Sequence, residues 1–132
     1  MAENTPELVY LLMVWNAIKD ESSKKWSLIN IFERIIIPAN LEFLYQSFDV
    51  ACRINNVHPG ESKTEVKIIS PDRKVFATSP LSGTLVAGDV SFVAKFTLLK
   101  FIQTGRYTYR VIHNGKVLAG TNNYYFDVTK QS

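Results

Sequence analysis

The sequence predicts an all-β protein: an antiparallel β-sandwich of seven to eight strands in one domain spanning residues 1–132. Three observations support this fold class. Short apolar runs recur along the chain, turn residues separate them, and no sustained apolar period of 3.6 residues appears. With 46% hydrophobic residues, a chain of this length can bury a core without disulfides or a structural metal.

The first predicted strand covers residues 8–19 and is apolar on both faces. Its two alternating sets are Leu8, Tyr10, Leu12 and Val14, and Val9, Leu11, Met13 and Trp15. Acidic residues precede this run, no cleavage site follows it, and it is too short for a membrane-spanning helix, so we expect a strand and no membrane span. A polar turn then leads to a second strand from Trp26 to Ile37, which Pro38 ends.

The middle of the chain supplies four more candidate strands. The third runs from Phe43 or Leu44 to Asn55, and short strands follow at Thr64–Ser70 and Val75–Thr78. Residues 79–89 are predicted to be a loop that includes at most a short edge strand. A long strand covers Val90–Ile102, with an ambiguous apolar phase after Leu98 that would require a bulge or a change of sheet. Its predicted inward side chains are Phe92, Ala94, Phe96 and Leu98.

The closing hairpin carries the strongest local signal. Asn114-Gly115 favours a two-residue type I′ turn, because both residues tolerate positive φ angles. His113 then faces Lys116, and the register places one set of side chains in the core: Tyr107, Tyr109, Val111, Leu118, Tyr124, Phe126 and Val128. The other set faces outward: Arg106, Thr108, Arg110, Thr121, Asn123 and Tyr125.

The single cysteine bears on redox state and location. Cys52 shares its alternation with Phe48, Val50 and Ile54, which predicts an inert core thiol. One cysteine excludes an intrachain disulfide framework and agrees with a reducing compartment, so we expect a cytoplasmic protein.

Charge is distributed unevenly along the chain. The net charge is +3, with −3 in residues 1–66 and +6 in residues 67–132. The basic residues do not cluster and do not alternate with exposed aromatics, so nucleic-acid binding is not expected. Lys95, Arg106 and Arg110 lie on outward faces, where they offer a candidate site for an anion.

The sequence shows no pattern of catalytic or metal-binding residues. His58 and His113 each lie beside a turn, and the sequence has no Gly-x-Ser-x-Gly motif whose serine either could activate. Both histidines are therefore predicted to be exposed, and replacing either should change the free energy of unfolding by less than about 0.5 kcal/mol. One cysteine and two separated histidines do not make a zinc site. Asp-x-Asp pairs for calcium and a phosphate loop are also absent. We therefore expect no enzyme activity, no metal and no cofactor.

Two segments together resemble a known family. Trp26-Ser-Leu-Ile-Asn-Ile-Phe-Glu-Arg-Ile35, followed by Pro38, resembles the N-terminal strand pair of a bacterial family of small β-sandwich proteins of unknown function. Gly105-x-Tyr-x-Tyr-x-Val with Asn114-Gly115 is similar to the closing hairpin of that family, and also to hairpins that end many immunoglobulin-like and C2-like sandwiches. The resemblance implies the fold and carries no active residue.

The two-sided first strand points to a function. In a two-layer sandwich one face of each sheet meets water, so an apolar outer face must be covered by the chain's own loops or by another subunit. We therefore expect a protein-interaction or assembly module, with a protein partner or a homo-oligomer, and with Leu11, Met13 and Trp15 as candidate interface residues. The alternative is a small-ligand or anion-binding module.

Overall fold

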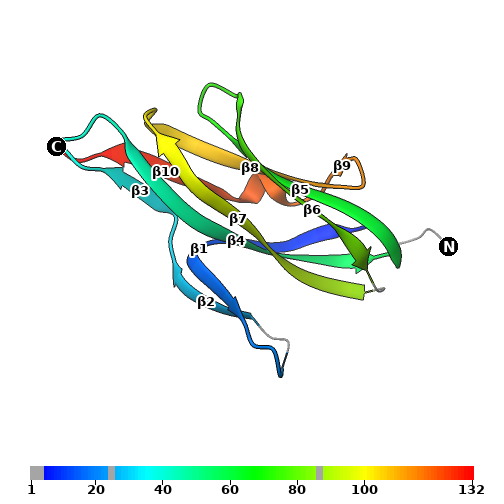
Figure 1. Ribbon diagram of the computed structural model, residues 1–132. Helices are drawn as coiled ribbons and strands as arrows, with labels where there is room; N and C mark the ends of the chain where they lie inside the picture. The colour runs from blue at the N-terminus through cyan, green and yellow to red at the C-terminus, as the bar shows by residue number, and fades with distance from the viewer. Residues whose placement is uncertain (1–4, 24–25, 86–87) are drawn as a thin grey trace.

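The computed structural model describes residues 5–23, 26–85 and 88–132, which form two β-sheets around one core (Figure 1). The first sheet is antiparallel and has the strand order β2-β1-β4-β7. Its strands are β1 (Glu7–Lys19), β2 (Trp26–Ile31), β4 (Leu44–Val57) and β7 (Gly88–Phe101). Among the described residues, no helix has both the length and the apolar character needed to cross a bilayer.

The second sheet has the order β3-β10-β8-β5-β6, with the short β9 beside β8. Its strands are β3 (Arg34–Ile37), β5 (Gly60–Ile69), β6 (Val75–Leu85), β8 (Gly105–His113), β9 (Lys116–Val117) and β10 (Tyr125–Lys130). A single turn of 3-10 helix, η1 (Thr121–Asn123), precedes β10. Because β3 pairs with β10 in parallel, the prediction of a wholly antiparallel fold is wrong for this sheet.

The described residues form ten strands instead of the predicted seven or eight, mainly because the second predicted strand is divided. β2 belongs to the first sheet and β3 to the second, and the chain crosses between the sheets at Phe32 and Glu33. Phe32 is half-buried and packs edge-on against Phe48, while the Glu33 carbonyl accepts a hydrogen bond from the Asp127 N–H at 3.0 Å. The β-branched composition favoured a strand throughout, but composition carries no information about which sheet each half joins.

Two further segments differ from the prediction. β6 continues to Leu85, so the expected loop at 79–89 is largely strand. In β7, Leu98 is 67% exposed instead of inward, because it adopts a positive φ of 49° at a register shift opposite Ser47. The Ser47 Oγ accepts the Leu98 N–H at 2.8 Å, and the shift turns Phe101 fully into the core. The bulge anticipated from the apolar phase therefore exists and includes Leu98 itself.

The closing hairpin is confirmed. Asn114 and Gly115 have φ angles of 49° and 84°, and His113 pairs with Lys116. Five of the residues predicted to be inward are at most 6% exposed: Tyr107, Tyr109, Val111, Leu118 and Phe126. Val128 is also buried, whereas Tyr124 is half-buried. The prediction that Thr121 faces outward is wrong: the residue is buried at the start of η1.

Replacing Gly115 with alanine should lower the free energy of unfolding by about 1 kcal/mol, because an L-residue is strained at this φ. An added Cβ meets nothing within 4 Å, so the loss reports backbone strain and not a clash. Urea unfolding of the variant measures it. Gly115→Asn is the control and should lose less, because asparagine tolerates the left-handed region. Equal losses of unfolding free energy in both variants would contradict the assignment of the loss to strain at the positive φ of residue 115.

Candidate functional site

A bulge in β1 and a change of its pairing partner determine which of its apolar side chains are buried. The pairing of β1 with β4 shifts between Leu8 and Tyr10, so that Leu8, Leu11 and Met13 all lie in the core. Of the candidate interface residues, Leu11 and Met13 are therefore 3% and 4% exposed, and only Trp15 lies at the surface, at 56% exposed. The structure does not bring the three together on one exposed patch.

Beyond Val14, β1 leaves β4 and pairs with β2 alone, from Asn16 opposite Ile29 to Lys19 opposite Trp26. We call this two-stranded hairpin, residues 14–19 with 26–31, the arm; it extends away from the other strands in Figure 1. Four apolar side chains of the arm are exposed: Trp15, Ile18, Ile29 and Ile31. The surplus of apolar residues recognised in the sequence thus lies at the surface of the arm.

A buried carboxylate ties the base of the arm to the first sheet. Asp49 of β4 is 7% exposed, and its Oδ2 accepts hydrogen bonds from the Ala17 N–H at 2.9 Å and from the Lys95 Nζ at 3.1 Å. The Ala17 amide thereby gains an acceptor at the point where β1 has left β4. Val14, opposite Asp49, is fully buried.

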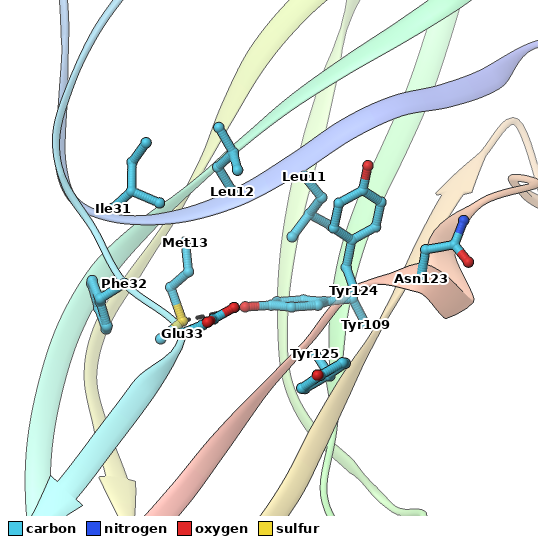
Figure 2. Close-up of a pocket in the computed structure, with 10 residues that line it drawn as sticks. All are labelled: Leu11, Leu12, Met13, Ile31, Phe32, Glu33, Tyr109, Asn123, Tyr124 and Tyr125. Atoms are coloured by element: carbon cyan, nitrogen blue, oxygen red, sulfur yellow. Dashed lines mark hydrogen bonds between the residues drawn. The ribbon is translucent and has the colours of Figure 1, made fainter.

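A hollow of about 480 Å³ opens beside the arm, where the edge of β1 meets the start of β10 (Figure 2). We call it the tyrosine groove. Three tyrosines line it on the side of the second sheet: Tyr109, Tyr124 and Tyr125. Leu11, Leu12 and Met13 line it from β1, and Ile31, Phe32 and Glu33 line it from the segment that crosses between the sheets.

Two tyrosine hydroxyls connect the walls of the tyrosine groove. Tyr109 reaches toward Met13 in Figure 2, and its hydroxyl donates to the Met13 Sδ at 3.2 Å. Burial raises the pKa of the Tyr109 hydroxyl well above its usual value, so it stays protonated as a donor. The Tyr124 hydroxyl donates to the Val9 carbonyl at 3.2 Å and so holds η1 and β10 near β1.

The same part of β1 is an open strand edge. At one end the Leu8 N–H donates to the Ala119 carbonyl at 3.1 Å, and at the other end the Phe32 N–H donates to the Met13 carbonyl at 2.9 Å. Between these points no strand of the described residues pairs with the side of β1 that faces away from β4. The tyrosine groove therefore combines a free backbone edge with an apolar and aromatic lining.

The candidate anion-binding residues are not brought together. Lys95 lies on the first sheet and binds Asp49, whereas Arg106 and Arg110 lie on the second. The Arg106 Nε donates to the Asp127 Oδ1 at 3.0 Å, and its guanidinium lies 3.7 Å from the centre of the Tyr125 ring. Arg110 is exposed and lies opposite Lys67 in the pairing of β5 with β8. Two of the three cations already have a carboxylate partner, which leaves no convergent site for an anion.

His58 and His113 are far apart in the sequence, but both line a hollow of about 370 Å³ beside the closing turn. His58 is exposed as predicted, but the prediction is wrong for His113, which is 6% exposed and whose Nδ1 lies 2.9 Å from the Thr64 Oγ1. Pairing with β5 buries His113 behind the turn, and the turn signal in the sequence cannot show that pairing. Within the described residues, no group of three or more His, Cys, Asp and Glu side chains is placed to hold a metal ion.

His113 should make stability depend on pH. Burial lowers its pKa from the ordinary value of 6.5, and His58 lowers it further. Below pH 6.5, His113 therefore binds a proton more readily in the unfolded chain than in the folded protein. The stability that is present above pH 6.5 is lost as the pH falls toward the lowered pKa of the folded protein. Urea unfolding between pH 7 and 5 should show a smaller loss for His113→Gln than for the wild type. Parallel curves for the two proteins would contradict this role.

Cys52 is 1% exposed in the core, which confirms its predicted burial. That burial raises the pKa of the thiol, so the reactive thiolate is disfavoured. Comparison with known proteins gives no family: neither a protein-family model nor a curated protein matches the chain. The functional argument therefore depends on the geometry of the arm and of the tyrosine groove.

Proposed function

We propose that this protein is a non-catalytic protein-interaction module that holds an extended segment of a partner protein against the open edge of β1. The observation that carries the proposal is the open edge of β1 at Leu11, between the Val9 carbonyl that Tyr124 binds and the Met13 carbonyl that Phe32 binds; this edge forms one wall of the tyrosine groove. An added strand satisfies such an edge through main-chain hydrogen bonds, and adjacent hollows select its side chains.

The chemistry of the groove indicates what the segment contains. Aromatic and apolar contact area is accessible in the groove, because Tyr125 and Ile31 are exposed and Tyr124 and Leu12 are half-buried. The buried floor of the groove is formed by Leu11, Met13 and Tyr109. Glu33 and Asn123 supply polar groups at the lining. The partner segment is therefore expected to be extended and to place an apolar or aromatic side chain against the rings of Tyr124 and Tyr125.

Selection from a library of random peptides displayed on phage tests this proposal. The enriched peptides should alternate apolar and polar residues, and they should protect the Leu11 amide from hydrogen exchange, because Leu11 faces the same open side of β1 as the Met13 carbonyl. Tyr125→Ser should weaken their binding at least about tenfold, as loss of an aromatic contact at a binding site does. Tyr45→Ser is the matched control, because Tyr45 is 53% exposed and lies outside the groove. Enriched peptides that ignore Tyr125 would count against the groove.

A small-ligand module is the second candidate, and the volume of the tyrosine groove favours it, since about 480 Å³ lies within the usual range for such sites. A small molecule would contact the tyrosines without pairing with β1. Thermal-shift screening of aromatic fragments separates the two functions. A fragment whose binding Tyr125→Ser weakens, while the Leu11 amide stays unprotected, would favour the ligand-binding function if no peptide is enriched.

The two-sheet architecture also supports a proposed kinship with immunoglobulin-like or C2-like sandwiches. The free thiol of Cys52 is suited to a reducing compartment, which supports a proposed cytoplasmic location. The parallel β3–β10 pair of the second sheet is the feature that a comparison of experimental structures has to match. Fractionation of native cells with an antibody against the protein tests the location.

A further inference from the structure

The arm has little of the protection that a two-stranded hairpin usually needs. An isolated hairpin is marginally stable in water, and a sheet edge is normally guarded by charges, prolines, bulges or a covering element. β2 is an edge strand of the first sheet, and its sequence from Trp26 to Ile31 contains neither a charge nor a proline; its one irregularity is Asn30, at a φ of 55°. Ile29 and Ile31 on this strand are 39% and 59% exposed.

The surface area of the chain gives a second, independent argument. The chain exposes 8252 Å², whereas a compact monomer of 15.0 kDa exposes about 7,000 Å². The surplus exceeds about 800 Å², which is the contribution of one partner to a protein interface of standard size. An arm that extends from the two sheets contributes to such a surplus, and Figure 1 shows β2 as its outer strand.

We propose that the arm docks on the arm of a second copy of this chain, with β2 antiparallel to β2 of the partner across a two-fold axis. A two-fold contact brings a strand against itself, so a charged strand would repel its copy, whereas the uncharged β2 meets no such repulsion. The exposed Ile29 and Ile31 of β2 lie at this contact, where side chains on one face of the paired strands pack against the partner's β2. The arm shares Ile31 with the lining of the tyrosine groove but pairs through β2 and not through the open edge of β1, so the inference goes beyond the proposed peptide binding.

Sedimentation velocity over a range of concentrations tests the dimer. The wild type should be dimeric at tens of micromolar, and Ile31→Lys and Ile29→Lys should raise the dissociation constant at least about tenfold. Ile102→Lys is the matched control, because Ile102 is also 59% exposed but lies beyond the end of β7. This variant should stay dimeric. A monomeric wild type at several hundred micromolar, or equal dissociation of the control, overturns the proposal.

A cross-linking experiment reports on the geometry without destabilising the arm. Under mild oxidation Ile29→Cys should form a covalent dimer, because residues near the middle of a self-paired strand lie close to their copies. Ile102→Cys should stay monomeric on a denaturing gel, and the buried Cys52 contributes no background. A dimer that forms in solution but cross-links through neither variant contradicts pairing through β2. Peptide binding by a monomeric Ile29→Lys protein would show that the two proposals stand separately, because Ile29 does not line the tyrosine groove.

Discussion

Truncating Phe126 to alanine should lower the free energy of unfolding by about 3–5 kcal/mol, the usual loss for a large aromatic side chain removed from a core. Phe126 is fully buried, stacks on Tyr107 at 5.1 Å between ring centres, and also contacts the rings of Phe48 and Phe101. It joins β10 to both sheets, so the cavity cannot close by a local shift. Chemical denaturation followed by tyrosine and tryptophan fluorescence measures the loss.

Phe43→Ala is the control for Phe126→Ala. Phe43 is 39% exposed and packs against Tyr45 and beneath the Lys100 ammonium group. Its truncation removes contacts at the surface and should cost less than about 1 kcal/mol. Similar losses for the two variants would mean that the core is not centred on β10.

Replacing Asp49 with alanine should cost about 1–3 kcal/mol, because the buried Ala17 N–H loses its acceptor and Lys95 loses its partner. The damage should be concentrated in the arm, whose base this carboxylate fixes. Hydrogen exchange should therefore accelerate at residues 14–19 more than in β8.

Asp89→Ala provides the comparison for Asp49→Ala. Asp89 forms an ion pair with Arg53 at 3.3 Å, but both side chains are largely exposed, so little stability should be lost. Uniform acceleration of exchange in the Asp49 variant would instead indicate a global role for this residue.

The sequence predicted most of the fold where the local signal and tertiary packing agree. The turn at Asn114-Gly115 fixed the register of the closing hairpin, and period-two alternation placed Phe48, Val50, Cys52 and Ile54 inside. Prediction failed where the chain changes partner. The crossing at Phe32, the shift at Leu98 and the departure of β1 from β4 each depend on pairings between distant residues.

The functional site was less accessible from sequence for the same reason. The sequence shows an excess of apolar residues near the N-terminus, but the bulge beside Leu8 places this residue of one alternating set in the core with Leu11 and Met13 of the other. The tyrosine groove combines β1 with residues near the C-terminus, and Tyr109 and Tyr124 were assigned to the core without a sign that they border a hollow. The sequence gives no sign that Asp49 is a buried acceptor, because this role depends on the fold of the arm.

The parallel pairing of β3 with β10 has a consequence for biosynthesis. A ribosome produces Ile35 and Ile37 early, yet the strand that shelters them is completed after all the other strands of the described chain. Until then β3 presents an apolar edge that other nascent chains can join, and long-range pairing of this kind is slow. The growing polypeptide thus passes through a prolonged aggregation-prone stage, and its yield should depend on chaperones that shield β3 before release.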